Sequence, residues 1–225
     1  MCWLKTARLL LFFLLCLSVQ NGWCAEADIE AESWPEFDIF IGLDKDRKNR
    51  IIILNSYARA PEHTYQETAL GVSFDRRFSK SWSWRAGLRY IAKEADPPDT
   101  DEVRGVFDLK WFRPLGRGWL LTDRNRVDIR YLDKTNKVTY RYRNRIMLEK
   151  PFRVGKSDWT GFASVEFYYD SSFNDWIRTR LIGGVSIPVS TWGALDVFYG
   201  YHLETQPNLE DAEAVGLAFS LFVYK

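Results

Sequence analysis

Apolar and polar side chains alternate at every second position through most of this chain, from about Trp34 to Tyr224. Turn residues interrupt the alternation roughly every ten positions, a spacing typical of barrel strands. Successive side chains of a β-strand point to opposite faces of a sheet, so each segment has one apolar face and one polar face. No segment has helical periodicity. The sequence therefore predicts an all-β fold.

The segment from Val138 to Glu149 illustrates the pattern. One face carries Val138, Tyr140, Tyr142, Ile146 and Leu148, and the other carries Thr139, Arg141, Arg143, Arg145 and Glu149. Eleven such segments can be counted along the chain. Single-chain bacterial barrels usually have an even number of strands, so we expect about 10–12, with either one strand hidden before Arg59 or the first segment outside the wall.

The N-terminal residues 1–27 have the features of a secretory signal peptide. Lys5 and Arg8 form a basic start, an apolar stretch too short to span a bilayer follows, and Ala25 and Ala27 provide a small-x-small cleavage site. Residues 28–225 are then predicted to form a single domain.

Cleavage of the leader also limits which reactive side chains remain in the mature chain. Cys2, Cys16 and Cys24 all lie in the leader, so cleavage leaves no disulfide and no cysteine ligand or nucleophile. Cleavage removes Lys5, Arg8 and Glu26 from 31 basic and 30 acidic residues, which leaves 29 of each. A balanced charge lacks the global basic field of nucleic-acid-binding proteins.

A membrane can be crossed by helices or by a closed barrel, because both pair every backbone polar group. Beyond Ala27 there is no run of about 18 apolar residues that could form a membrane helix. We therefore predict an antiparallel up-and-down transmembrane β-barrel in the bacterial outer membrane. The alternative is a soluble periplasmic β-protein with a charged face in water.

Two groups of side chains favour the membrane. Tryptophans gather at strand starts, where membrane barrels carry interfacial aromatic girdles; the predicted interface residues are Trp82, Trp119, Trp159, Trp176 and Trp192. Arginines crowd the polar face, and their planar guanidinium groups suit partly buried networks with carboxylates. The predicted lumen network comprises Arg124, Arg126, Asp128, Arg130, Arg141, Arg143, Arg145, Glu149, Glu166, Arg178 and Arg180.

Several segments together resemble a known family. They are Trp34, residues 88–90, the Asp-Arg-Asn-Arg run at 123–126, the Tyr-Arg-Asn-Arg run at 142–145, and residues 164–170, 178–183 and 195–201. In these the chain is similar to an uncharacterised outer-membrane β-barrel family of Gram-negative bacteria, a domain of unknown function. The resemblance implies an outer-membrane location and no known activity, so no catalytic residue is carried over.

The expected partners follow from this assignment. Outer-membrane lipids would surround a monomeric barrel, and Gly216, Phe219 and Leu221 resemble the signal read by the barrel-insertion machinery. No nucleic acid and no cofactor is expected, and the sequence identifies no ligand. A transition-metal site is not favoured, because the mature chain has only two histidines and no cysteine.

His202 is the weak candidate for catalysis. It shares the polar face with Glu204, and a hydrolase would need a serine beside it, for which Ser186 and Ser220 are candidates across neighbouring strands. His63 lies in a loop.

Three hypotheses remain. The favoured one is a non-enzymatic barrel with a charged, largely ion-paired lumen and a structural or binding role through its lumen or loops. The second is a small anion-preferring pore, and the third is a barrel-embedded lipid hydrolase. A narrow barrel leaves little free lumen, so the first outranks the second.

Overall fold

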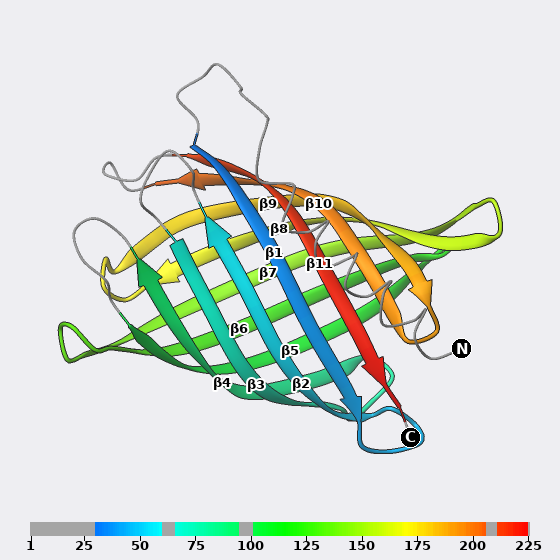
Figure 1. Cartoon of the computed structure of the whole chain (residues 1–225), viewed down its shortest axis with the longest axis horizontal. Helices are drawn as coiled ribbons and strands as arrows, with labels where there is room; N and C mark the ends of the chain where they lie inside the picture. The colour runs from blue at the N-terminus through cyan, green and yellow to red at the C-terminus, as the bar shows by residue number, and fades with distance from the viewer. Residues whose placement is uncertain (1–29, 60–65, 95–100, 206–210, 225) are drawn as a thin grey trace, which may run out of the picture.

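Eleven strands close into one barrel in the computed structural model, which describes residues 30–59, 66–94, 101–205 and 211–224 (Figure 1). The predicted signal peptide lies outside these residues. No helix in the described ranges is long and apolar enough to cross a membrane. The strands are β1 (Glu30–Gly42), β2 (Asn49–Arg59), β3 (Gln66–Arg77), β4 (Trp82–Glu94), β5 (Glu102–Gly116), β6 (Trp119–Leu132), β7 (Lys137–Val154), β8 (Ser157–Asp170), β9 (Asp175–Ser190), β10 (Gly193–Glu204) and β11 (Ala212–Val223).

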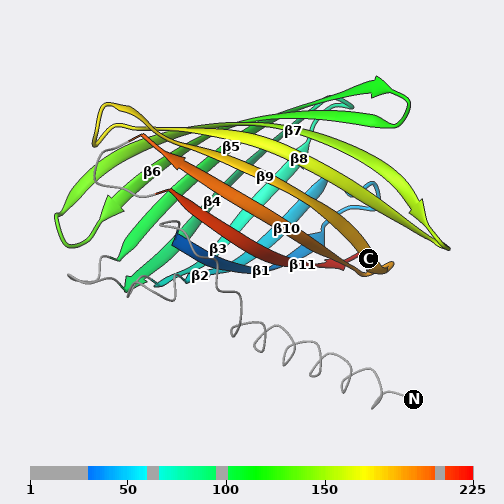
Figure 2. The same ribbon diagram turned by 90° about the horizontal axis from the view of Figure 1, so that it is seen from above.

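Each strand pairs with its neighbours in sequence, which gives the predicted up-and-down order (Figure 2). All of these pairings are antiparallel. The closing pair differs: β1 runs parallel to β11, from Glu30 opposite Ala212 to Ile41 opposite Val223. Alternate strands reverse direction, so an odd number makes the first and last run the same way. The expected barrel is confirmed, with one parallel seam in place of a wholly antiparallel wall.

Two arrangements were expected to give the barrel an even number of strands, and both are wrong. The stretch before Arg59 is a single strand, β2, and the first segment is β1, a full member of the wall. In β2 both faces are apolar over part of their length: Ile52 and Leu54 are buried inside, while the alternate residues Ile51 and Ile53 lie on the outer side. This two-sided apolar run is why the facing of β2 could not be assigned from alternation.

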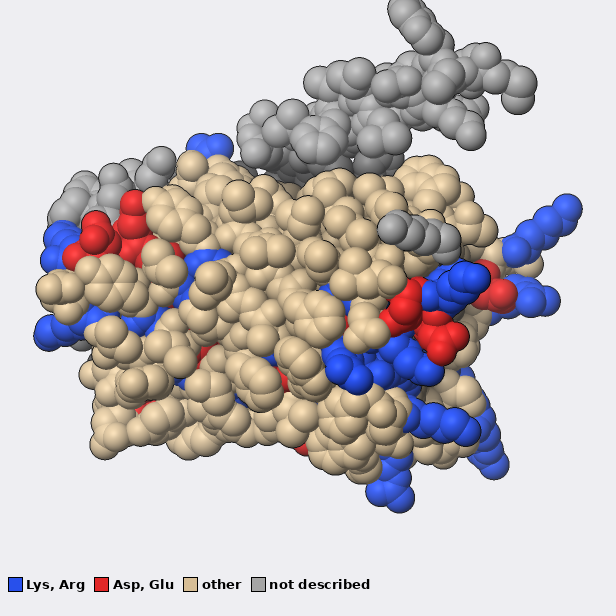
Figure 3. Space-filling view, turned by 90° about the horizontal axis from the view of Figure 1, so that it is seen from below, with Lys and Arg blue, Asp and Glu red and all other residues tan. Residues whose placement is uncertain are grey.

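The alternation predicted the facing of most side chains. In β5, Val103 and Phe107 are half exposed on the outside, whereas Arg104 and Asp108, which directly follow them, are buried inside. Figure 3 shows the result on one face: a broad, mostly uncharged band in which only small areas of charged atoms show, with Lys, Arg, Asp and Glu gathered toward its two ends. The apolar stripes therefore cover the outside of the cylinder and the charged rows line its interior.

One residue on the predicted apolar face lies inside. Ile177 is 5% exposed and lines the lumen, because Tyr168 pairs with Arg178 while Tyr169 pairs with Trp176. This register shift is a β-bulge, which leaves Ile177 unpaired and places it on the same side as Arg178. Alternation cannot reveal such a shift, because the bulge changes the parity of the strand.

Adjacent glycines in β9 provide a test of this packing. A Cβ on Gly184 would lie 2.5 Å from the Val197 carbonyl oxygen and 2.6 Å from the Phe198 Cβ, whereas a Cβ on Gly183 meets nothing within 4 Å. Overpacking of this kind typically costs about 1–3 kcal/mol. Gly184→Ala should therefore lower the free energy of unfolding in detergent by that amount, measured by urea titration of tryptophan fluorescence. Gly183→Ala should not; equal losses would contradict the assigned facing.

Candidate functional site

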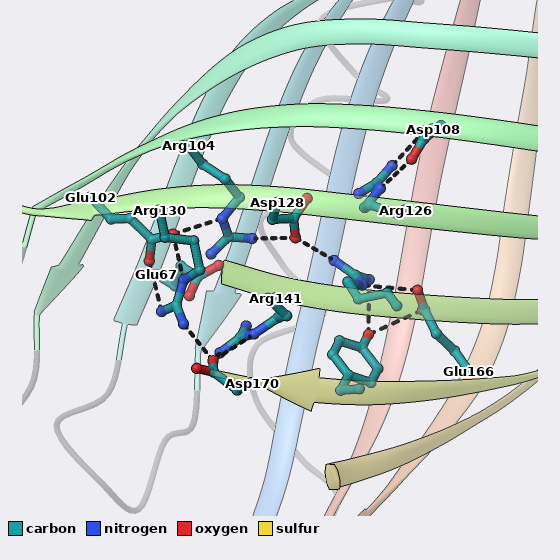
Figure 4. Close-up of polar contacts among 12 residues, drawn as sticks. Glu67, Glu102, Arg104, Asp108, Arg126, Asp128, Arg130, Arg141, Glu166 and Asp170 are labelled. Atoms are coloured by element: carbon teal, nitrogen blue, oxygen red, sulfur yellow. Dashed lines mark hydrogen bonds and ion pairs between the residues drawn. The ribbon is translucent and has the colours of Figure 1, made fainter. Parts of the chain in front are cut away.

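The inward faces of β5, β6, β7 and β8 hold a dense group of buried ion pairs, which we call the ion-pair network (Figure 4). Arg126 binds Asp108 through two contacts, Nε to Oδ1 at 2.5 Å and Nη2 to Oδ2 at 2.9 Å. Arg130 binds Glu102 in the same bidentate way, at 2.8 and 3.0 Å. Such paired contacts are the strongest geometry that arginine and a carboxylate can adopt.

Further contacts connect the Arg130–Glu102 pair to neighbouring groups of the network. Asp170 accepts hydrogen bonds from Arg130 Nη1 at 2.6 Å and Arg141 Nη2 at 2.8 Å. Glu102 also accepts from Arg104 Nε at 2.7 Å. Asp128 lies 3.8 Å from Arg104 and 3.9 Å from an Arg143 nitrogen. The pairs therefore run laterally along one wall, between neighbouring strands or from β6 to β8, and the wall is neutralised locally.

The two Arg-Asn-Arg runs lie directly opposite each other on β6 and β7. Arg124 faces Arg145, Asn125 faces Asn144, and Arg126 faces Arg143. Like charges opposite each other destabilise a sheet unless carboxylates compensate them. Glu166 on β8 supplies one, because it accepts a hydrogen bond from Arg143 Nε at 2.9 Å and also binds Arg124. Asp108 on β5 supplies the other.

An aromatic group crosses the lumen from β1 toward this network. The Arg180 guanidinium lies 4.6 Å from the Trp34 ring centre and 5.3 Å from the Tyr168 ring centre. The Arg143 guanidinium lies 4.5 Å from the Tyr168 ring centre. Trp34 also packs against His202, with ring centres 4.6 Å apart. Cations over aromatic faces are attracted by the ring quadrupole, so these contacts tie β1 to β7, β8, β9 and β10.

His202 belongs to this group. It is 2% exposed, and its Nε2 accepts a hydrogen bond from Arg180 Nε at 2.5 Å. In the strand register His202 lies opposite Arg180 and Ala212. The candidate serines lie further along the same pairs, Ser186 opposite Asp196 and Ser220 opposite Ala194, so neither is beside His202.

A further set of inward charges makes no ion pair within the described part of the chain. Cations of this kind are Arg89, Lys110 and Arg145; carboxylates are Glu36, Asp38, Glu149 and Asp196. Asp38 on β1 and Asp196 on β10 interact electrostatically with each other, and Asp38 also with Arg85 and Arg89 on β4. Among these described residues, Asp38 and Asp196 thus form one unpaired acidic group near the β1–β11 seam, whereas Glu149 shares β7 with the unpaired Arg145.

The lumen contains a cavity of about 970 Å³. Its lining includes 12 basic and 8 acidic side chains together with Trp34, Phe162 and Phe198. Among the residues that the structure describes, the buried Nε–H groups of Arg85, Arg89 and Arg124, which belong to this lining, have no hydrogen-bond acceptor. Among the described residues no group of three or more His, Cys, Asp or Glu is arranged to hold a metal ion. The lining is therefore polar and carries more basic than acidic side chains, although several of its arginines pair with carboxylates behind them, such as Asp108 and Asp128.

The predicted network residues divide into four groups. The first group belongs to the ion-pair network and comprises Arg124, Arg126, Asp128, Arg130, Arg141, Arg143 and Glu166. Arg178 pairs separately with Glu204, and Arg180 binds His202. The last group, Arg145 and Glu149, makes no ion pair within the described residues. Glu102, Arg104 and Asp170 were missing from the predicted set. Glu102 and Arg104 could have been predicted to face the lumen, because they alternate with the apolar Val103. Asp170 could not, because it lies at the end of β8, where the alternation stops.

The predicted interface tryptophans lie near strand ends. Trp82, Trp119 and Trp159 lie at or near the starts of β4, β6 and β8, and Trp192 lies in the turn before β10, which is the same end of the barrel. Trp176 starts β9 at the opposite end, where its ring contacts Tyr142 and Tyr169. Four of the five are between 38% and 48% exposed, so these rings lie on the outer surface.

A family model matches residues 48–213, which is most of the chain, and its description is "Protein of unknown function (DUF2490)". This chain belongs to that family. The match runs from β2 to the start of β11, so it includes every residue of the ion-pair network and leaves β1 outside. No curated protein matches the chain. Family membership therefore agrees with the expected uncharacterised family and assigns no activity to the lumen.

Breaking the network should be costly because it leaves buried charges unpaired. Glu166 is 2% exposed and serves both Arg124 and Arg143, so Glu166→Gln should lower the free energy of unfolding by about 3–5 kcal/mol. Asp158→Asn breaks the exposed Arg153–Asp158 pair and should cause no measurable loss. Urea unfolding in detergent compares the two. Similar, small losses in both variants would contradict the assigned role of Glu166.

Proposed function

We propose that this chain is an integral outer-membrane β-barrel whose ion-paired lumen gives it a structural and ligand-binding role rather than an enzymatic one. The observation that carries the proposal is the arrangement of faces: apolar side chains outside a closed cylinder and charged networks inside it. In water an exposed apolar wall of this extent would aggregate, whereas in lipid it is the favoured surface.

The connections between strands suggest an orientation. At the end where β11 finishes, the described turns are two to six residues long, and at the other end the connections span four to seven positions. Membrane barrels have short periplasmic turns and longer extracellular loops. The proposal therefore puts the end of β11 toward the periplasm, and the cavity between Asp38, Asp196 and the arginine wall becomes accessible from one or both aqueous sides.

Heat-modifiable gel mobility tests the membrane assignment. A folded barrel resists SDS until it is boiled, because its strands form one closed hydrogen-bonded unit without edges. We expect the protein in the outer-membrane fraction and a faster band in unheated samples than in boiled ones. Recovery in the soluble periplasmic fraction without a mobility shift would contradict the proposal.

A small anion-preferring pore is the second candidate, and the excess of basic over acidic side chains in the cavity lining favours it. The two functions differ in planar bilayers. A binding barrel braced by Trp34 and Arg180 should give no stable conductance steps. A pore should give steps whose reversal potential indicates anions, and Arg145→Glu should move that potential toward cations because Arg145 makes no ion pair within the described residues.

A further inference from the structure

Four polar side chains form a hydrogen-bonded cluster on the outer face of the wall, where the rest of β6 and β7 is largely apolar. The cluster consists of Asp123 and Asn125 on β6 and Tyr142 and Asn144 on β7. Each alternates with inward-facing residues in its strand: Asp123, for example, separates Thr122 and Arg124, which are 4% and 7% exposed. The same Arg-Asn-Arg runs that send arginines inward thus send these groups outward.

The cluster is at mid-height of the wall. Asn125 lies midway along β6 between Trp119 and Tyr131, which are 40% and 39% exposed at the two ends of the strand. Asn144 is near the middle of β7. If the barrel spans the membrane as proposed above, a carboxylate and two amides face the acyl chains. Ionisable groups at that depth are unfavourable and usually mark a functional contact.

Internal hydrogen bonds satisfy only part of the cluster. Asn144 Nδ2 donates to Asp123 Oδ1 at 2.7 Å and to Asn125 Oδ1 at 3.2 Å, and Asn125 Nδ2 donates to Asp123 Oδ1 at 3.3 Å. Tyr142 donates its hydroxyl hydrogen to Asn125 Oδ1. Within the described residues this leaves one Asn125 N–H, Asp123 Oδ2 and Asn144 Oδ1 without a partner. The cluster therefore presents both a donor and acceptors to its surroundings.

We propose that this face is the contact surface for a second copy of the chain, which forms a two-fold dimer in the membrane. A two-fold axis brings the same patch together from both copies, so the free Asn125 N–H of one copy can meet the Asp123 or Asn144 oxygen of the other. Polar side chains of this kind join membrane-spanning elements, because the alternative is an unpaired group in hydrocarbon.

Apolar side chains around the cluster fit the same contact. Val127 and Ile146 are each 41% exposed on β6 and β7, and Phe167 on β8, opposite Asn144, is 38% exposed. Packing of these groups around a polar centre would exclude lipid from the cluster. The dimer replaces the monomer expected from the sequence, and it rests on the membrane location proposed above.

Single-cysteine cross-linking tests the dimer, because residues 30–225 contain no cysteine. Val127→Cys and Ile146→Cys should each give a disulfide-linked dimer when isolated outer membranes are oxidised. Val215→Cys, on the outer side of β11 and 54% exposed, is the matched control and should stay monomeric. Equal cross-linking at all three positions, or none at the first two, would overturn the proposal. Cross-linking to a different protein would show that the occupant is not a second copy.

A second variant separates self-association from folding. Asp123→Leu combined with Asn144→Val in the Val127→Cys background removes the polar centre while leaving an apolar outer face. The disulfide-linked dimer should fall at least severalfold, and the heat-modifiable folded monomer should remain. Unchanged cross-linking would contradict a role for the cluster. Loss of heat modifiability in the Val127→Cys parent would instead count against the membrane barrel itself, so the two proposals fail in different ways.

Discussion

Closure of the sheet is the constraint on which the rest of this structure depends. A closed cylinder pairs every strand on both sides and has no free edge, so its backbone polar groups are satisfied without water outside the wall. Here closure is completed by the parallel pairing of β1 with β11. Once the wall is closed, each strand must send alternate side chains to two very different surroundings, and the sequence alternates accordingly.

Charges sent into a narrow lumen need partners, and the structure provides them mainly within the wall. Glu102, Asp108 and Glu166 each bind an arginine on an adjacent strand, and Glu166 reaches two. Buried ion pairs need not add net stability, but losing one partner is strongly unfavourable. The network therefore mainly specifies the register of the strands. A strand shifted by one residue would send its guanidinium groups outward and break many ion pairs together.

Much of this arrangement could be predicted from the sequence. Alternation indicated the all-β fold, and the leader together with the lack of a membrane helix indicated a closed barrel with Arg124, Arg126 and Arg143 facing inward. Other features have no local signal. The parallel seam arises because the number of strands is odd. The bulge at Ile177 depends on a single unpaired residue. The contact of Trp34 with Arg180 joins segments that are far apart in the chain. Lateral pairing along one wall, rather than across the lumen, follows from strand register, which periodicity does not encode.

Depth-resolved accessibility along β8 tests the central claim most directly. Ala163 and Val165 lie on the outer side of this strand, and Ser164 between them lines the lumen. A spin label attached to a cysteine at each position can be relaxed by oxygen, which concentrates in lipid, or by a water-soluble nickel complex. The account predicts that oxygen dominates at residues 163 and 165 and nickel at residue 164. Nickel dominance at residues 163 and 165 would contradict it.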